Sequence, residues 1–249
     1  MSDTLVIQSH RSPLPYSWLE QCIVSVRRWA ESGHHEYRFV GDELFEVLPD
    51  DIRQLASSRP VMASDLARLL LLRDGLASGY QTVIWLDADF LIFDPSRFVL
   101  PDDSFAVGRE VWVDHDHSGK LKAWTKVHNA LLMFCRDNSF LDFYIDTAKR
   151  FLGHGTSKVP PQFIGPKLLT ALHNVAGFPV MEIAGMLSPM VARDILAGGG
   201  VALDLFRKKS PVPIAGANLC CSSCDSGELT DTESSELVDC LVSNPGKWF

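Results

Sequence analysis

The hydrophobic positions of the chain occur in short segments whose spacing alternates between that of strands and that of helices. Apolar runs typical of β-strands occupy residues 4–7, 37–40, 82–86, 105–113, 120–134, 180–183 and 201–206. Apolar residues at helical spacing occupy residues 18–29, 63–76, 140–151, 168–175 and 234–241. Because the chain opens with a strand, a helix and a second strand, the pattern predicts an α/β fold with crossover helices.

The polar segments predict turns and loops between these elements. Residues 114–119 separate two strands and predict a hairpin or a long loop, residues 49–59 a short helix or loop, and residues 222–235 a loop. No repeat and no linker rich in Gly, Pro or Ser interrupts the sequence. We therefore expect one domain over residues 1–249, in which residues 176–249 are C-terminal elements added to the core.

The composition argues against several classes of protein. The 249 residues are 46% hydrophobic, which is too apolar for a disordered chain, and 31 acids against 23 Lys and Arg give a net charge of −8. This acidity argues against nucleic-acid binding, which needs clustered basic residues. No apolar run approaches the ~20 residues of a membrane span, and the start lacks the pattern of a signal peptide. We expect a cytoplasmic protein without a transmembrane segment.

The strand at residues 82–86 ends in two carboxylates, Asp87 and Asp89. Residues i and i+2 of an extended chain point to the same side, so both side chains can converge on one cation. Ligands of open α/β sheets bind outside the carboxyl ends of the strands, and carboxylate oxygens suit Mg²⁺ or Mn²⁺. The alternative is an acidic turn that caps backbone amides. The sequence therefore indicates a candidate cation site with this alternative open.

The helix at residues 63–76 carries the polar residues Ser64, Asp65 and Arg68 near its start. Asp65 and Arg68 are three residues apart and share one face of the helix. They form either a surface ion pair worth ~0–1 kcal/mol or an acid and a guanidinium directed at sugar hydroxyls and phosphate. Both interpretations are compatible with the sequence.

Several of these motifs, in this order, resemble glycosyltransferases that contain a DXD motif. The resemblance is carried by Asp65-x-x-Arg68, the Leu-rich helix to Gly75, Asp87-x-Asp89, and the stretches 129–133, 140–143 and 164–170, the last with a Gly-Pro-x-x-Leu-Thr pattern. Residues 80–93 are more similar to the Leu-Asp-Ala-Asp strand of glycogenin-like and galactosyl-transferring enzymes. The match covers roughly residues 60–172, with a weaker fit of the first strand and helix.

The resemblance implies a GT-A fold, a Rossmann-like α/β domain with a central, mostly parallel sheet and helices on both faces. It implies a hexosyltransferase that uses a nucleoside-diphosphate sugar, in the first place a UDP-sugar, with Mn²⁺ or Mg²⁺ as cofactor, and that retains the anomeric configuration. Asp89 would coordinate the metal, and Asp87 would bind it through water or contact the ribose or the sugar. Asp65 and Arg68 would hold the donor sugar and its phosphate.

Other expected site residues depend on this resemblance and on their place in the chain. The donor-binding set is completed by Gln8, Ser9 and His10 at the end of the first strand, by Ser64, by Asn129, and by Gly165 and Pro166. Gln162 is a candidate for the face of the anomeric carbon, and Asn218 is a candidate for a further metal ligand. Gly165-Pro166 has an alternative role as the start of a helix.

The remaining His and Cys residues favour structural roles. His115 and His117 offer metal-ligand types, but a solvated hairpin tip is the favoured interpretation. Cys221-x-x-Cys224, with two further cysteines nearby, lacks the second Cys pair or His pair that a tetrahedral zinc site needs.

Two other functions compete with the transferase. A phosphatase of the haloacid dehalogenase type also has Asp-x-Asp after a hydrophobic strand, but that motif lies near the N-terminus and has Thr or Val where this chain has Leu91. A GT-A-like protein that binds without catalysis is the other alternative. The acceptor, whether saccharide, protein or small molecule, is not indicated by the sequence.

Overall fold

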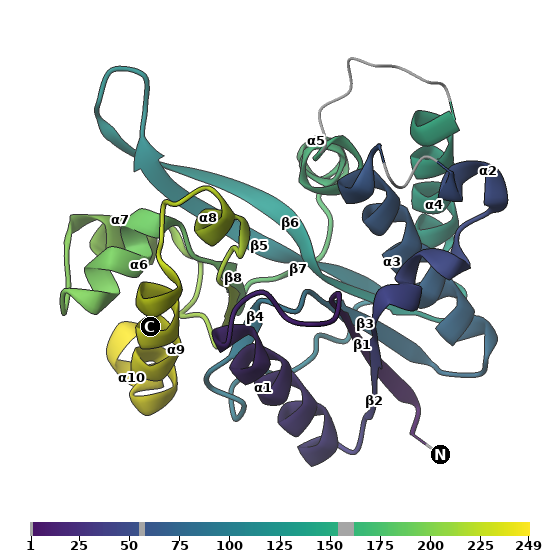
Figure 1. Ribbon diagram of the computed structural model, residues 1–249, viewed down its shortest axis with the longest axis horizontal. Coiled ribbons are helices and arrows are strands. Elements are labelled where there is room, and N and C mark those ends of the chain that lie inside the picture. The colour runs from purple at the N-terminus through teal and green to yellow at the C-terminus, as the bar shows by residue number, and fades with distance from the viewer. Residues whose placement is uncertain (1, 55–57, 154–161) are drawn as a thin grey trace.

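The computed structural model describes residues 2–54, 58–153 and 162–249. Within them, the large sheet has the strand order β2-β1-β3-β6-β5-β7 (Figure 1). Its strands are β1 (Thr4–Ser9), β2 (Glu36–Val40), β3 (Thr82–Leu86), β5 (Phe105–His115), β6 (Leu121–Cys135) and β7 (Val180–Met181). β1 is parallel to β2 and β3, and β5 is parallel to β7, whereas β6 is antiparallel to β3 and β5. The expected mostly parallel α/β sheet is confirmed.

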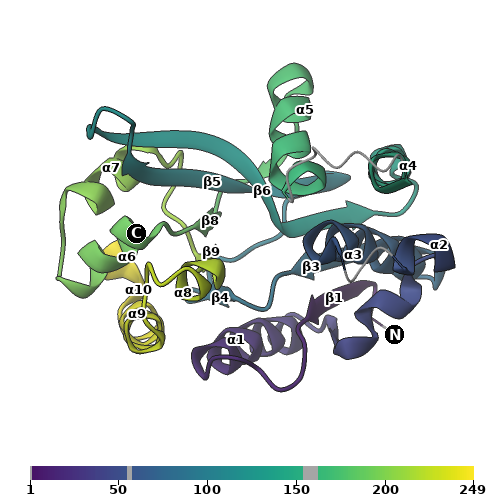
Figure 2. The ribbon, with the colours of Figure 1, turned by 45° about the horizontal axis from the view of Figure 1, so that its top comes forward.

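Alternate residues of the strands support helices on opposite faces of the large sheet. On one face, Leu5 and Trp85 pack against α3 (Pro60–Ala77) and α4 (Ser139–Gly153). On the other face, Val6 and Ile84 pack against α1 (Trp18–Ser32). Figure 2 shows α1 and α3 on opposite sides of β1 and β3. The period-two alternation of a strand therefore produces the expected helices on both faces.

A small sheet connects the large sheet to the C-terminal region, which we define as residues 184–249. Its order is β4-β9-β8, and β9 is antiparallel to β4 and parallel to β8. The strands are β4 (Phe90–Ile92), β8 (Ala184–Met186) and β9 (Gly216–Asn218). The helices of this region are α6 (Pro189–Leu196), α7 (Val201–Lys209), α8 (Ser222–Asp225), α9 (Asp231–Ser243) and α10 (Pro245–Trp248). They form a separate apolar cluster with the start of α1.

Two expectations for the C-terminal region were wrong. Residues 201–206 form the first part of α7 instead of a strand, because the carboxylate of Asp194 accepts hydrogen bonds from the backbone N–H groups of Ala202 and Leu203 and so caps a helix. Residues 222–235 contain α8 and the start of α9 instead of a continuous loop. α9 begins with a capping box, in which the side chains of Thr230 and Glu233 satisfy each other's backbone N–H groups.

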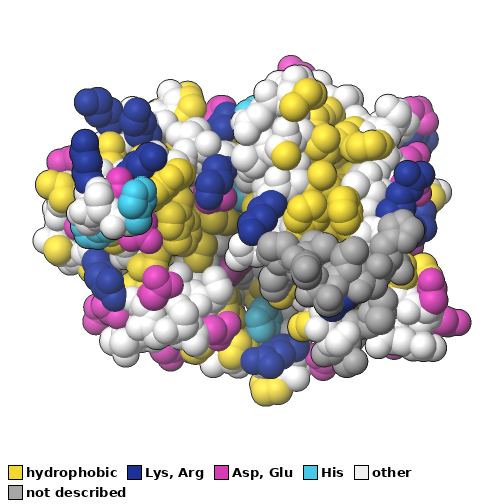
Figure 3. Space-filling model, turned by 90° about the horizontal axis from the view of Figure 1, so that it is seen from above, with side chains coloured by type: hydrophobic (Ala, Val, Ile, Leu, Met, Phe, Trp, Pro, Cys, Tyr) yellow, Lys and Arg dark blue, Asp and Glu magenta, His cyan; other side chains and the backbone are white. Residues whose placement is uncertain are grey.

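The connections follow the sequence pattern more closely. The shorter helical segments are η1 (Asp42–Val47), α2 (Asp50–Arg53), η2 (Phe163–Lys167) and α5 (Leu168–Ala176). β5 and β6 form a long hairpin that projects from the molecule (Figure 1) and confirms one of the two expected connections. His115 and His117 are exposed at its tip, and Figure 3 shows basic, acidic and histidine side chains mixed at this end. No helix among the described residues is both long and apolar enough to span a bilayer.

Candidate functional site

The acidic pair lies on the segment that joins the large sheet to the small sheet. Asp87 directly follows β3, and its backbone N–H donates to the carbonyl of Ala130 on β6 at 2.9 Å. The buried side chain of Gln8, on β1, donates to the Asp87 carbonyl at 3.0 Å. The carbonyl of Asp89 accepts from the N–H of Leu219 at 3.0 Å. Hydrogen bonds to the backbone of Asp87 and Asp89, from the large sheet and from the C-terminal region, therefore position the pair at the carboxyl end of two parallel strands.

One oxygen of the Asp87 carboxylate is held by an ion pair and by a hydrogen bond. Oδ1 lies 3.0 Å from a terminal nitrogen of Arg68 and accepts a 2.7 Å hydrogen bond from the indole nitrogen of Trp85. Within the part of the chain that the structure describes, Oδ2 receives no hydrogen bond, and the shortest contact between Arg68 and this carboxylate is to Oδ1. The Asp87 side chain is 27% exposed, so this second oxygen is the one open to a ligand.

The Asp89 carboxylate is held from the C-terminal region. Oδ1 accepts from the side-chain nitrogen of Asn218 at 2.5 Å, and Oδ2 accepts from the backbone N–H of Cys221 at 2.7 Å. Burial, together with the nearby charge of Asp87, raises the pKa of Asp89 to about 6. Two carboxylates in one partly buried site repel each other, and a bound cation would relieve that repulsion.

Arg68 lies between two carboxylates instead of at the surface. Its side chain is 11% exposed and that of Asp65 is 5% exposed, with 3.5 Å between the paired atoms. Arg68 also donates to the carbonyl of Asn129 at 2.9 Å and lies 5.1 Å from the ring centroid of Trp85. Burial raises the pKa of Asp65 to about 6, although Arg68 opposes the shift. The alternative of a surface ion pair is therefore wrong.

Asn129 and Gly165 support Asp65. The side-chain nitrogen of Asn129 donates to Oδ1 of Asp65 at 2.8 Å. Gly165 lies against the same Asn129 side chain, and a Cβ atom at this position would come within 2.7 Å of it. A side chain at residue 165 would therefore displace the amide of Asn129, and Pro166 follows Gly165 inside η2. Asn129 and Gly165 thus stabilise the site indirectly, through Asp65.

The acidic pair lines a small pocket of about 180 Å³. The expected site residues that line it are Ser9, His10, Ser64, Arg68, Asp87 and Asp89, and the further lining residues are Leu44, Trp85, Ala88 and Cys221. Gln8, Asp65 and Asn129 are buried and support the pocket from outside its lining. Gln162 is exposed just before η2 and, like Pro166, is not part of the lining.

Sequence reasoning missed four of the lining residues, and two of these, Trp85 and Cys221, bond the acidic pair. Trp85 is two residues before Asp87 on the same strand, so strand alternation alone places both side chains on one side. Cys221 had no signal, because its contact with Asp89 spans 132 residues of sequence.

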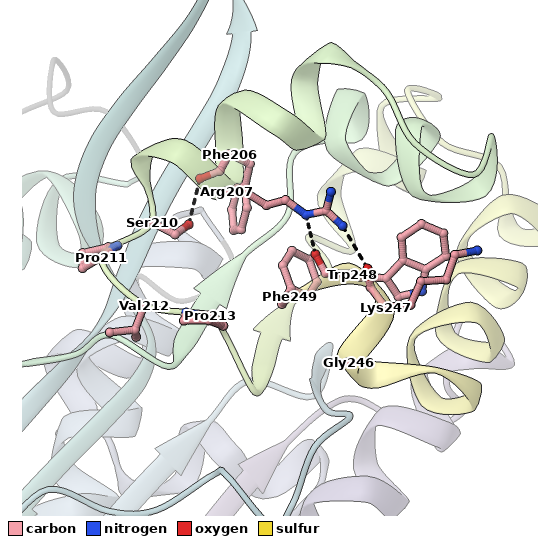
Figure 4. Close-up of a pocket in the computed structure, with 10 residues that line it drawn as sticks. All are labelled: Phe206, Arg207, Ser210, Pro211, Val212, Pro213, Gly246, Lys247, Trp248 and Phe249. Carbon is pink, nitrogen blue, oxygen red and sulfur yellow. Dashed lines mark hydrogen bonds between the residues drawn. The ribbon is translucent and has the colours of Figure 1, made fainter.

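The larger cavities lie elsewhere and have few charged groups. One of about 740 Å³ runs along α1 beside Trp29 and Phe93. Another, of about 370 Å³, lies between α7 and α10 (Figure 4). In the latter, Arg207 donates to the carbonyls of Trp248 and Lys247, so its guanidinium is already engaged. Size therefore does not select the candidate site, and the arrangement of charges is what indicates it.

The residues of the acidic pair fit a divalent cation. Oδ2 of Asp87 is open, and the carboxylate of Asp89 retains lone pairs beyond its two hydrogen bonds. Among the described residues, no group of three or more His, Cys, Asp or Glu side chains is arranged around a common metal position. Protein ligands would therefore be few, as is usual where Mg²⁺ keeps waters and shares substrate phosphates. In this structure the amide oxygen of Asn218 accepts from the N–H of Cys220.

Comparisons with known proteins support the fold and give no family. No protein-family model matches the sequence, and no curated protein matches it. Among solved structures, a glycosyltransferase involved in glycosylation of the major capsid of PBCV-1 matches with a TM-score of 0.51 and 9% identity, over 95% of this chain and 98% of that chain. The galactosyltransferase LgtC, in complex with donor and acceptor sugar analogues, matches with a TM-score of 0.46 and 14% identity, over 98% and 99%. The chain shares the fold of the PBCV-1 glycosyltransferase, in agreement with the GT-A fold expected from the sequence.

Proposed function

We propose that the protein is a glycosyltransferase that moves a sugar from a nucleoside-diphosphate sugar to a saccharide, protein or small-molecule acceptor. The observation that carries the proposal is the acidic pair at the carboxyl end of β1 and β3, inside a pocket of a glycosyltransferase-like fold. The donor in this proposal is a UDP-sugar, the cofactor is Mn²⁺ or Mg²⁺, and the reaction retains the anomeric configuration.

The chemistry of the pocket supports this proposal. Asp87 and Asp89 would hold the cation, which, when bound, neutralises the negative charge that develops on the diphosphate leaving group. Asn218 would support Asp89, to which it already donates a hydrogen bond. Ser9, His10 and Ser64 line the same pocket and offer polar atoms to the donor. In this proposal the two carboxylates bind the cation, and the other polar residues of the pocket contact the nucleotide sugar.

The two alternative functions make different predictions. The fold match favours a glycosyltransferase over a phosphatase of the haloacid dehalogenase type, and p-nitrophenyl phosphate turnover tests the latter directly. A non-catalytic binding protein would retain the pocket and bind a nucleotide sugar without turning it over. Binding and turnover therefore need to be measured separately on the same protein.

The decisive experiment compares donor turnover with and without metal. We expect one nucleotide sugar, from a panel of UDP- and GDP-sugars, to be hydrolysed or transferred with Mn²⁺ and not with excess chelator. Asp89→Ala should lower turnover by roughly 10²–10³-fold, the loss typical when one group that stabilises developing charge is removed. Asp146→Ala, at an exposed acid of α4, is the matched control and should keep full activity.

Each contrary outcome has a distinct meaning. Full turnover in chelator would refute metal dependence. Mn²⁺-dependent binding of a donor, seen as a thermal shift without turnover under any acceptor tested, would favour the binding protein. Neither binding nor turnover across the panel would contradict the glycosyltransferase itself.

A further inference from the structure

We propose that Trp85 is a positioning residue that fixes the Asp87 carboxylate so that only its Oδ2 faces a cation. The inference rests on the proposed function, because it concerns the cation site of the acidic pair. It assigns a specific task to a side chain that reads as an ordinary core aromatic in a hydrophobic strand. Trp85 is 2% exposed, yet it lines the pocket and its indole nitrogen donates to Asp87.

Strand geometry directs the indole at the acid. Trp85 is the second-last residue of β3, and Asp87 follows two residues later. The two side chains therefore lie on the same side of the chain. The indole N–H donates to Oδ1 of Asp87 at 2.7 Å. An indole nitrogen is a hydrogen-bond donor only. It can therefore hold a carboxylate oxygen, but it cannot itself bind the cation.

Arg68 completes the restraint from a second direction. Its guanidinium lies 3.0 Å from the same Oδ1 and 5.1 Å from the Trp85 ring centroid. Asp65 and the carbonyl of Asn129 hold that guanidinium in place. Oδ1 therefore has an ion pair with Arg68 and a hydrogen bond from the buried Trp85, and a cation that binds Asp87 meets Oδ2.

The consequence is a carboxylate that is oriented before the cation arrives. Side chains that hydrogen-bond to metal ligands fix ligand orientation, and their loss typically lowers metal affinity by roughly 10–100-fold. Asp89 needs no such aromatic partner, because backbone and amide donors from the C-terminal region hold both of its oxygens. Trp85 supplies for Asp87 what Asn218 and Cys221 supply for Asp89.

The test is Trp85→Phe, which keeps an aromatic ring beside Arg68 and removes the N–H donor together with part of the indole ring system; the control variant loses the same atoms. Trp29→Phe is the matched control, because Trp29 is also buried and donates one indole hydrogen bond, at 2.9 Å to the carbonyl of Phe98. The primary measurement is the binding of Mn²⁺ alone to the full chain, followed by electron paramagnetic resonance of free Mn²⁺. A second measurement is the Mn²⁺ concentration that gives half-maximal donor turnover.

We expect Trp85→Phe to weaken Mn²⁺ binding by roughly 10–100-fold and Trp29→Phe to leave it within about twofold. Turnover at saturating Mn²⁺ should recover to within a few-fold of the wild type, because the substitution acts on cation binding; a general loss of folding would not recover. Equal Mn²⁺ affinity in wild type and Trp85→Phe would overturn the inference and leave the proposed function standing. A wild-type protein that binds no Mn²⁺ would overturn both the inference and the metal dependence.

Discussion

Asp87 and Asp89 are two residues apart, yet two different regions of the molecule hold their carboxylates. The side chain of Asp87 is held by Arg68 of α3 and Trp85 of β3, which precede it in the chain. The side chain of Asp89 is held by Asn218 and Cys221, which follow it by 129 and 132 residues. The acidic motif is local in sequence, but the geometry of its second carboxylate depends on a distant segment.

This difference means that docking of the C-terminal region onto the large sheet completes the site. β4, which begins directly after Asp89, pairs with β9, and Asn218 is the last residue of β9. Any change that loosens β9 should therefore disturb Asp89 before it disturbs Asp87. Changes that loosen α3 should disturb Asp87 before they disturb Asp89. Four substitutions test this comparison, from the largest expected effect to the smallest.

The largest effect is expected for Arg68→Met, on the Asp87 side. Loss of the guanidinium leaves Asp65 buried without its cation, and breaking a buried pair in this way costs about 3–5 kcal/mol in the free energy of unfolding. Urea denaturation measures the loss. Arg73→Met is the control on the same helix, since Arg73 is exposed and its pair should contribute at most about 1 kcal/mol. Equal losses in both variants would contradict the structural role of Arg68.

The next effect is a pH dependence at His128, which joins the two regions. Its ring contacts the carbonyl of Ala184 on β8 at 3.3 Å and accepts from the N–H of Ala130 at 3.1 Å. Burial lowers the pKa of His128 to about 4 from its ordinary value near 6.5. Between these values the unfolded chain binds the proton and the folded chain does not, so stability falls as the pH decreases from 6.5 to 4.

The measurement is the free energy of unfolding of wild type and His128→Gln at pH 7 and at pH 4. The wild type should lose about 3 kcal/mol more than the variant over this range. Asp65 and Asp89 act in the opposite direction, because burial raises the pKa of each to about 6 and their protonated forms favour the fold at low pH. These contributions are common to both proteins, so parallel pH curves would refute the role of His128.

A smaller loss is expected for Asn218→Ala, on the Asp89 side. The substitution removes the hydrogen bond to Asp89 and leaves the N–H of Cys220 without its acceptor, which should cost about 1–3 kcal/mol in stability. Mn²⁺ binding should weaken as well. Asn174→Ala, at an exposed position of α5, is the matched control for both measurements. A variant with normal stability and Mn²⁺ affinity would show that the backbone alone holds Asp89.

The smallest effect is expected for Thr230→Ala, which removes the capping box of α9. Loss of an N-cap typically costs about 1 kcal/mol. Because α9 lies in the C-terminal region but does not contact the carboxylates, thermal unfolding should shift while donor turnover at 25 °C stays unchanged. Thr232→Ala, exposed in the first turn of the same helix, controls for helix propensity. A loss of turnover would show that α9 is coupled to Asp89.

Local chemistry explains which elements could be predicted from the sequence. The strand at residues 82–86 matches β3 in full, since a continuous buried run flanked by turns has few other structures available. The strand predicted at residues 201–206 became a helix, because its N-terminus is capped by Asp194 from another helix. A cap contributed by a separate element leaves no signal in the segment it stabilises.

The sequence alone determined the α/β fold, the acidic pair at a strand end and the shared helix face of Asp65 and Arg68. These follow from side-chain periodicity, which depends only on neighbours a few residues away. Only the tertiary structure decided that Arg68 is buried between Asp65 and Asp87, and that Asn218 and Cys221 hold Asp89. Such contacts join residues that are far apart in the sequence, and sequence separation does not indicate distance in space. The packing of the C-terminal region and of α3 against the large sheet brings these residues together.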